Sequence, residues 1–538
     1  MHQTSLAKAQ GFQQKGCGRG QASVLRLLAI LILAVVACTG IAAAAQNILL
    51  IIADDYGVDS SSLYNTNSSA SLPPTPAIAS LAQSGVLFRN AYAYPVCSPT
   101  RSCLITGRYG FRTGIGDVIV GAASPMLTAA EFTLPEAFAA NASLGYQLAH
   151  FGKWHLNNAP ASPNTIGRWP HFAGSLIGAL ASYTNWSKTV DGVSNITTNY
   201  ATTDLVNDAL AWIQGQGTKP WFAWIAFNAR HTPLHKPPNN LCPHYTTLSG
   251  TAADINAHPR LYFEAMVEAM DTEMNRLLAG VDRANTHILF LGDNGTAGQV
   301  IQPPFPSTRG KSTLYEGGIH VPFIIAGPAV VNPGRTNTTL VNAVDVFATT
   351  LDLAGINMSN TVPAGVTLDS KSLVPTLQSN TRLSRYAYAE IFGSNIATNE
   401  GGRALRDDQF KLLRFSDRHE EFYDLTSDPY EATNLLANPL TATQLGHYYN
   451  LTIALGDYQN ILTPPAITTW SQANHQFTIT LQRSTNLTYS LWRAPILDPL
   501  AWSPLTNAIA VTNSLTTLTL TDPAANANAS FYRVMAQQ

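Results

Sequence analysis

Charged side chains are scarce in this sequence. Asp, Glu, Lys and Arg make up 12% of its 538 residues, and the formal net charge is −2. A protein that holds nucleic acid or an acidic membrane surface by counterion release needs a concentrated basic field. We therefore expect no nucleic-acid partner, and any attraction for an anionic substrate must come from a local group of cations.

Cysteine is also scarce. The chain has five cysteines, of which Cys97, Cys103 and Cys242 follow residue 45. Three thiols in so long a chain exclude a disulfide scaffold. A Cys103–Cys242 disulfide and two buried free thiols both remain open, because the sequence gives no distance between the two residues.

The first 45 residues differ from the rest of the chain. Basic residues precede an apolar run from Leu27 to Cys38, and small residues follow it up to Ala45. This is the layout of a signal peptide at residues 1–45, and it predicts a secreted, periplasmic or cell-surface protein. Residues 35–38, Val-Val-Ala-Cys, also resemble a bacterial lipobox, in which case Cys38 would carry a lipid tether. The run is short for a permanent membrane span of about 20 residues.

Apolar runs that end in polar loops alternate with helical patterns from residue 46 onward. Asn47–Ala53, Trp221–Asn228, His287–Leu291 and Val321–Ile325 read as buried strands, and Ala257–Ala279 has apolar residues at helical spacing. Buried strands separated by helices predict an α/β sheet that is covered on both faces. We expect this main domain to span residues 46–380.

The pattern changes near Arg382. Shorter strands follow, and they predict a small α+β subdomain at residues 381–462. Pro464 and Pro465 mark a boundary, after which Thr, Ser and Asn dominate short alternating segments. We expect an appended β-rich module at residues 466–538.

Carboxylates stand at the ends of two apolar strands. Asp54 and Asp55 directly follow one strand, and Asp293 and Asn294 follow another. Adjacent buried carboxylates repel each other unless a cation neutralises them, and strand ends in an open α/β sheet are where ligands bind. Each pair alone is also ordinary turn chemistry. Together they form an all-oxygen set that suits calcium, which tolerates irregular coordination better than magnesium does.

A third segment runs Cys-Ser-Pro-Thr-Arg from Cys97 to Arg101 and reaches Thr-Gly-Arg at residues 106–108. Ser98 and Pro99 predict an N-cap and a first helical residue, which would place residue 97 at a helix N-terminus where backbone N–H groups favour anions. Arg101 would lie on the same helix face. Taken alone, the thiol could also be a structural residue at the helix end.

These segments resemble those of the sulfatase family in the alkaline phosphatase superfamily. Its hallmark is Cys-x-Pro-x-Arg followed by Thr-Gly-Arg. The matching order continues through Gly-Lys-Trp-His at Lys153 and His155, Arg-His-Thr-Pro at His231, and Gly-Lys…Tyr-Glu-Gly-Gly-x-x-Val-Pro at Lys311. The resemblance covers about residues 46–440. It implies an α/β fold in which a large mixed sheet is sandwiched by helices, with the main domain as the catalytic one.

The resemblance also implies a nucleophile and a metal. In this family a formylglycine-generating or equivalent maturation enzyme oxidises the motif cysteine, here Cys97, to formylglycine, and the hydrated aldehyde attacks the sulfate ester. Calcium binds this residue and the four oxygen-bearing side chains Asp54, Asp55, Asp293 and Asn294. The implied activity is that of an arylsulfatase-like sulfuric ester hydrolase, and the implied partner is a sulfated small molecule or glycan.

Five further side chains have implied roles. Arg101 stabilises the deprotonated diol, and Lys153, His231 and Lys311 hold the charge of the sulfate group. His231 or Lys311 gives a proton to the leaving alcohol. His155 removes the proton of the second diol hydroxyl, which expels sulfate.

One segment departs from the family pattern. His320 stands where many relatives have arginine, which leaves the metal and the nucleophile untouched but puts the local packing or a nearby charge in question. Glu316, in the same segment, fits a structural hydrogen-bonding role better than a catalytic one.

Two other functions fit the same residues. A phosphomonoesterase or a phosphonate or phosphodiester hydrolase of the same superfamily would also use a metal and a cationic clamp. A non-catalytic sulfated-glycan binder would keep Cys97 as a thiol. The sequence does not identify the substrate, since specificity lies in loops around the pocket, such as Ser162–Asn195 and Leu234–Asp254.

Overall fold

The structure is a computed structural model that describes residues 45–393, 396–457, 467–473, 476–482, 488–494, 503–505, 508–514, 517–525 and 531–537. The signal peptide and the lipobox at Cys38 are predictions that lie outside these residues. Within the described ranges, no helix is both long and apolar enough to cross a membrane.

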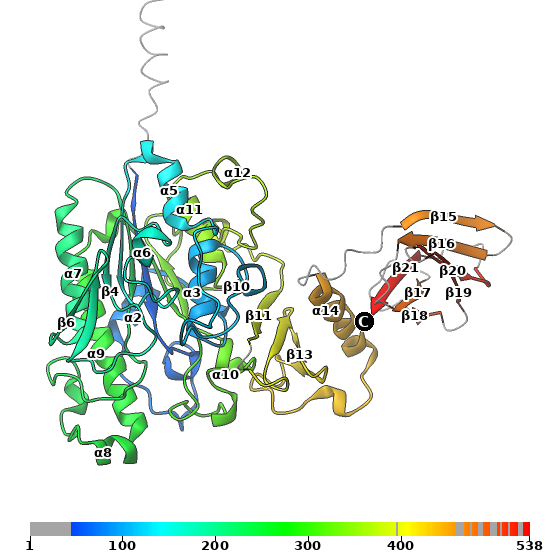
Figure 1. Ribbon diagram of the computed structural model, residues 1–538. Coiled ribbons are helices and arrows are strands. Elements are labelled where there is room, and N and C mark those ends of the chain that lie inside the picture. Colours follow the sequence, from blue (N-terminus) through cyan, green and yellow to red (C-terminus); the bar gives the residue numbers. More distant parts are fainter. Residues whose placement is uncertain are drawn as a thin grey trace, which may run out of the picture. The chain divides into compact units, whose positions relative to one another are not determined.

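A ten-stranded mixed sheet forms the centre of the main domain (Figure 1). Its strands are β1 (Asn47–Ala53), β2 (Gly85–Tyr92), β3 (Gln147–Gly152), β4 (His171–Gly174), β5 (Trp186–Val190), β6 (Val193–Thr197), β7 (Trp221–Ala226), β8 (Thr286–Gly292), β9 (Phe323–Ala326) and β10 (Arg335–Asn342). Their order is β10-β2-β9-β8-β1-β7-β3-β4-β5-β6. The neighbours β8, β1, β7 and β3 run parallel, whereas β9 is antiparallel to β8 and β2. The predicted mixed α/β sheet is confirmed.

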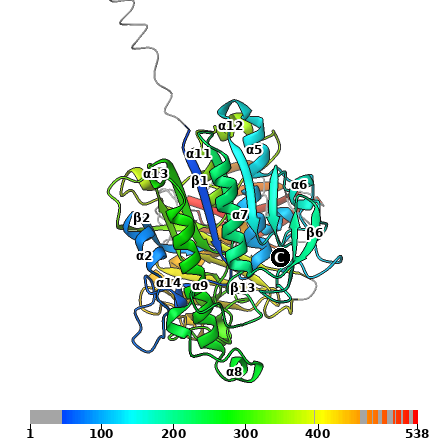
Figure 2. The ribbon, with the colours of Figure 1, turned by 90° about the vertical axis from the view of Figure 1, so that its left-hand side faces the viewer.

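Helices cover both faces of this sheet, as Figures 1 and 2 show. One face carries α2 (Pro76–Gln83), α7 (Ala201–Gly215) and α9 (Pro259–Ala279), and the other carries α3 (Cys97–Thr106), α5 (Leu134–Ala140) and α11 (Asp345–Leu353). On β1, Ile48 and Leu50 pack into one core and Leu49 and Ile51 into the other. Since successive strand side chains point to opposite faces, a strand buried on both must be apolar throughout, which is the pattern the sequence shows.

Residues 162–195 differ from the expectation. They were expected as a loop, but β4, β5 and most of β6 extend the sheet there. Val193 and Ile196 of β6 are 62% and 69% exposed. These short strands lack a buried apolar run, so the periodicity that reveals central strands is missing.

Three smaller antiparallel sheets follow along the chain. The first contains β11 (Ala387–Ile391), β12 (Gly402–Arg406), β13 (Phe410–Phe415) and β14 (Glu420–Asp424), and α14 (Ala442–Asp457) packs on it. The other two contain β15 (Ile467–Ala473), β16 (Gln476–Gln482), β20 (Thr517–Asp522) and β19 (Ile509–Ser514), and β18 (Ser503–Pro504), β17 (Thr488–Ala494) and β21 (Phe531–Gln537). The expected α+β and β-rich folding patterns are both present, while the exact domain boundaries stay predictions.

Gly152 ends β3 directly before Lys153 and has a positive φ of 94°. A Cβ atom there would lie 2.0 Å from the Ala226 carbonyl oxygen on β7. We expect Gly152→Ala to lower the free energy of unfolding by about 3 kcal/mol, because strain adds to a steric clash between two central strands. Urea denaturation measures this loss.

The matched control is Gly145→Ala. Gly145 also has a positive φ, 75°, but a Cβ atom there would meet nothing within 4 Å. Its cost should be about 1 kcal/mol, from the left-handed backbone alone. If both variants lowered the free energy of unfolding equally, the close approach of Gly152 to β7 would not affect stability.

Candidate active site

The parallel strands β8, β1, β7 and β3 end at the same edge of the sheet. The polar residues that follow these strands therefore come from segments far apart in the sequence and meet in space. They are Asp54 and Asp55 after β1, Lys153 and His155 after β3, His231 after β7, and Asp293 and Asn294 after β8.

Helix α3 brings Cys97 to this edge. The helix begins at Cys97, and Val96 is its N-cap in an extended conformation without a side-chain cap. The prediction of Ser98 as N-cap is therefore wrong: the Ser98 hydroxyl oxygen accepts a hydrogen bond from the Ile119 N–H at 3.2 Å. Cys97 still lies in the first turn, where unpaired backbone N–H groups favour negative charge.

Three buried carboxylates each contact one cation. The pairs are Asp54 with Lys153 at 2.6 Å, Asp55 with Lys311 at 2.5 Å, and Asp293 with Arg101 at 2.7 Å. None of the six side chains is more than 14% exposed. Burying a charge is costly unless it is paired, so the pairing explains how the fold tolerates this cluster.

Arg101 contacts the acidic cluster through the carboxylate of Asp293. Its Nε and Nη2 donate to Asp293 Oδ2 at 3.1 and 2.7 Å, and its Nη1 donates to the Lys153 carbonyl oxygen at 2.7 Å. These bonds fix the Asp293 carboxylate and the end of β3. A direct role of Arg101 at residue 97 stays a prediction.

The Cys97 sulfur lies among these charges. It is 3.3 Å from Lys153 Nζ, 3.7 Å from Lys311 Nζ and 3.5 Å from Asp54 Oδ1. Burial alone would raise the pKa of this thiol, but Lys153 and Lys311 lower it to about 6. Position 97 is therefore a place where an anion is stabilised.

This shift is measurable on protein that still has the thiol. Thiolate absorbance near 240 nm should show a first step with a midpoint at about pH 6, because the Cys97 thiol is protonated below this pH and ionised above it. Cys103 and Cys242 are free and buried, and burial raises both their pKa values, that of Cys242 to about 11. Cys97→Ala should remove the step. A first midpoint above pH 8 in the parent protein would contradict the proposed effect of the two lysines.

The sequence left open whether Cys103 and Cys242 form a disulfide or are two buried free thiols, and the structure shows free thiols. Cys103 packs in a core with Tyr109 and Leu405, whereas Cys242 packs in a separate one with Leu248. The two residues form no disulfide.

The donor set fits a hard divalent cation. One ligand atom from each of Asp54, Asp55, Cys97 and Asp293 lies within 4.8 Å of the others. Asn294 donates from Nδ2 to Asp55 Oδ1 at 2.8 Å, while its buried Oδ1 has no hydrogen-bond partner within the described residues. A buried oxygen without a partner beside three carboxylates is what an oxygen-ligated ion such as calcium would satisfy.

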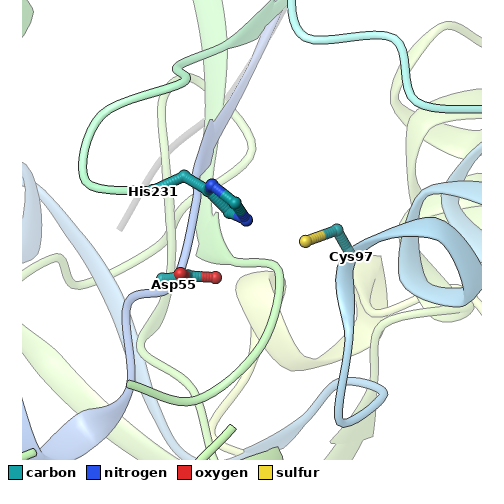
Figure 3. A group of neighbouring side chains, drawn as sticks. All are labelled: Asp55, Cys97 and His231. Carbon is teal, nitrogen blue, oxygen red and sulfur yellow. The ribbon is translucent and has the colours of Figure 1, made fainter. Parts of the chain in front are cut away.

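His231 belongs to the same group. Figure 3 shows its ring and the Cys97 sulfur pointing toward each other beside Asp55, and these three residues also have ligand atoms within 4.8 Å of one another. Burial and the charge of Lys153 would lower the pKa of His231, but Asp55 and Asp54 raise it above its usual value. A histidine that holds its proton near neutrality suits proton donation.

His155 has the opposite character. Its Nε2 lies 3.1 Å from the Ile119 carbonyl oxygen, and its buried Nδ1 has no hydrogen-bond partner in the described part of the chain. Because a carbonyl only accepts, Nε2 carries the proton and Nδ1 keeps its lone pair. Burial, then Lys153 and Arg101, lower the pKa of His155 well below its usual value. A neutral ring with a free lone pair suits proton acceptance.

Glu316 and His320 lie outside this group. Glu316 accepts from the Tyr92 hydroxyl at 2.9 Å and pairs with Lys411 at 2.9 Å. His320 Nδ1 lies 3.2 Å from Glu316, its Nε2 is 2.8 Å from the Arg89 carbonyl oxygen, and its ring stacks on Tyr92. These contacts agree with a structural role for both residues.

Sequence reasoning missed Arg230, which precedes His231 and is 1% exposed. The only signal in the sequence was a charged residue inside a motif at a strand end.

Two family models match the chain. The model "Sulfatase" matches residues 46–356, which is more than half of the chain. The chain belongs to the sulfatase family. A second model, "N-sulphoglucosamine sulphohydrolase, C-terminal", matches residues 309–449, so this family member has both parts that the two models describe.

Curated relatives are similarly distant from this sulfatase-family chain. Arylsulfatase J of Mus musculus is 28% identical over 63% of this chain and 57% of its own length. The ulvan-active sulfatase of Formosa agariphila is 24% identical over 73% of this chain and 76% of its own length. N-acetylgalactosamine-6-sulfatase of Rattus norvegicus is 27% identical over 64% of this chain and 69% of its own length. The chain thus spans little more than half the length of arylsulfatase J.

Solved structures share the fold of this family member. Ps i-CgsB in complex with k-i-k-neocarrahexaose matches with a TM-score of 0.65 and 22% identity, over 77% of this chain and 93% of that one. A protein in complex with its substrate D-glucosamine-2-N,6-O-disulfate matches with a TM-score of 0.62 and 20% identity, over 78% and 99%.

Proposed function

We propose that this sulfatase-family chain hydrolyses sulfate esters of carbohydrates, with residue 97 as a formylglycine nucleophile and calcium as cofactor. The observation that carries the proposal is the environment of Cys97, which lies beside two ammonium groups, those of Lys153 and Lys311, and a cluster of three carboxylates. Cations attract the sulfate group, and carboxylates hold the metal. The relatives named for ulvan and N-acetylgalactosamine 6-sulfate support a carbohydrate substrate.

The residues of the cluster would hold the two groups that the chemistry requires. Asp54, Asp55, Asp293 and Asn294 would ligate calcium, which when bound polarises a sulfate oxygen. A formylglycine at position 97, once formed, supplies an attacking hydroxyl and a second hydroxyl whose deprotonation allows sulfate to leave.

Two lysines orient and neutralise the sulfate group. Lys153 and Lys311 both reach the atom at the end of side chain 97, and each is held by a carboxylate. They are already in place before substrate binds, so they stabilise negative charge without reorganising during the reaction.

The two histidines divide the proton transfers. His231, whose pKa is raised by the neighbouring carboxylates, gives a proton to the leaving alcohol. His155, whose ring is neutral and whose Nδ1 has no hydrogen-bond partner in the described ranges, takes a proton in the release of sulfate. Within the described residues His155 makes no hydrogen bond to the acidic cluster, and we expect it to act when the hydrated residue 97 is present.

Export and maturation complete the proposal. The signal-peptide layout supports a secreted, periplasmic or cell-surface location, and the segment from Cys97 to Arg108 supports recognition by a formylglycine-generating or equivalent enzyme. The lipobox at Cys38 supports a lipid tether as the alternative to free secretion.

Sulfate release tests the function. Protein co-expressed with a formylglycine-generating enzyme is incubated with ulvan, carrageenan, N-acetylgalactosamine 6-sulfate and an aryl sulfate, and free sulfate is measured by ion chromatography. We expect release from at least one carbohydrate sulfate. Faster hydrolysis of the matching phosphate esters would favour the phosphohydrolase alternative, and binding without any release would favour the glycan binder.

A further inference from the structure

Arg230 is a fourth cation beside the acidic cluster. It is 1% exposed, and its Cζ lies 3.9 Å from the ring centroid of Tyr56 and 5.2 Å from that of Phe263. Its Nη2 donates a long hydrogen bond, of 3.5 Å, to the Asp54 carbonyl oxygen. Its Nε and Nη1 have no hydrogen-bond partner within the described residues. Aromatic faces, rather than a carboxylate, enclose this guanidinium group.

This situation contrasts with that of the other three cations. Lys153, Lys311 and Arg101 each contact one carboxylate, whereas in the described part of the chain no carboxylate oxygen lies within 4 Å of Arg230. The carboxylates that act on it are Asp55, Asp59 and Asp54, all at longer range. Arg230 therefore neutralises no single carboxylate and acts on several of them at once.

A buried charge without a partner destabilises a fold. Burial lowers the pKa of Arg230 only to about 10, so the guanidinium remains charged at neutral pH. If residue 230 had only a structural role, an apolar side chain of similar shape would stabilise the fold more than arginine does. The free-energy cost of burying this guanidinium group therefore indicates that its charge has a role.

The contacts of Arg230 place that charge beside the segments that carry the carboxylates Asp54 and Asp55. Arg230 directly precedes His231, and Tyr56 directly follows Asp55. The Tyr56 ring also meets Phe290 of β8 edge to face, with centroids 6.1 Å apart. The guanidinium group is thus fixed by the two strand ends, β1 and β7, that present Asp54, Asp55 and His231.

We propose that Arg230 is a positioning residue that sets the charge balance of the site, weakening calcium binding in favour of binding the anionic sulfate ester. This inference rests on the proposed function. A cation that is not consumed by an ion pair lowers the negative potential of the cluster, which opposes a divalent cation and favours an anion.

Arg230→Met tests the charge by replacing arginine with a shorter, uncharged and unbranched side chain. We expect the calcium Kd, measured by isothermal titration calorimetry, to fall about fivefold and the KM for the sulfated substrate to rise about tenfold, with a smaller change in kcat. The melting temperature of the metal-free protein should stay equal or rise, because the variant removes a buried charge that pairs with no carboxylate among the described residues. Loss of a structural residue would instead lower the melting temperature and weaken calcium binding.

Two further variants complete the test. Arg230→Lys keeps the charge but replaces the planar group that lies over the Tyr56 and Phe263 rings. It should shift the calcium Kd and the KM clearly less than Arg230→Met does. Arg89→Met removes an exposed arginine whose Cζ lies 5.4 Å from the ring centroid of Tyr64 and should change neither quantity. A lysine variant in which both values shift as far as predicted for Arg230→Met would overturn the charge-balance role even if the methionine variant failed to fold.

The outcomes also separate this inference from the proposed function. A parent protein that neither binds calcium nor releases sulfate would contradict the proposed function, whatever the variants do. A parent protein that does both, together with an Arg230→Met variant in which calcium binding weakens or KM is unchanged, would overturn the role of Arg230 alone.

Discussion

Cys97→Ala is expected to lower kcat for sulfate release by a factor on the order of 10⁴ or more, as is usual when a covalent nucleophile is removed. Alanine can be neither oxidised to formylglycine nor ionised, while Lys153, Lys311 and the acidic cluster stay in place. Substrate binding should therefore persist, and the loss should appear in kcat rather than in KM. Initial rates of sulfate release, measured on protein from the same co-expression host, give both quantities.

Two companion variants make this result specific. Cys97→Ser offers a single hydroxyl, which can attack once but has no second hydroxyl for expelling sulfate, so at most one turnover is expected. Cys103→Ala removes the other thiol of helix α3, which is buried in a different contact set, and should leave kcat within about twofold. Multiple turnover by Cys97→Ala would refute the nucleophile.

Removing the metal is the second large effect. Chelation of calcium should lower kcat/KM by about 10³-fold, since polarisation of the sulfate oxygen is lost, and added calcium should restore the rate. Magnesium at the same concentration should restore less, because it demands octahedral geometry and dehydrates reluctantly. Full activity in protein shown by elemental analysis to contain no divalent metal would rule out a metal-dependent mechanism.

Asn294→Ala tests the same metal site by removing one expected calcium ligand instead of the ion. It removes the buried Oδ1, which has no hydrogen-bond partner among the described residues, and the hydrogen bond from Nδ2 to Asp55 Oδ1. We expect the calcium Kd to rise about tenfold with the three carboxylate pairs intact. An unchanged Kd would show that Asn294 is not a ligand.

Much of the site could be predicted because its residues stand at the ends of unambiguous strands. The apolar run from Asn47 to Ala53 is buried on both faces, so its period and its end are clear in the sequence, and Asp54 and Asp55 are fixed by that end. The same holds for Asp293 after β8. Parallel neighbours then bring such ends together.

The contacts between these loops could not be predicted. Sequence indicates that Arg101 lies on α3, but its pairing with Asp293 joins residues 192 positions apart. The cap of α3 was misplaced because Ser98 has a competing partner, Ile119, in a distant loop. Arg230 was overlooked because its burial between two aromatic rings depends on Phe263 of α9, which no local pattern connects to it.

The mass of the tryptic peptide spanning residues 90–101 shows whether residue 97 is a formylglycine, when it is measured on a preparation that releases sulfate over many turnovers. We expect the mass of an aldehyde or its hydrate in place of the Cys97 thiol in the active fraction. An unmodified cysteine throughout a fully active preparation would contradict the formylglycine nucleophile.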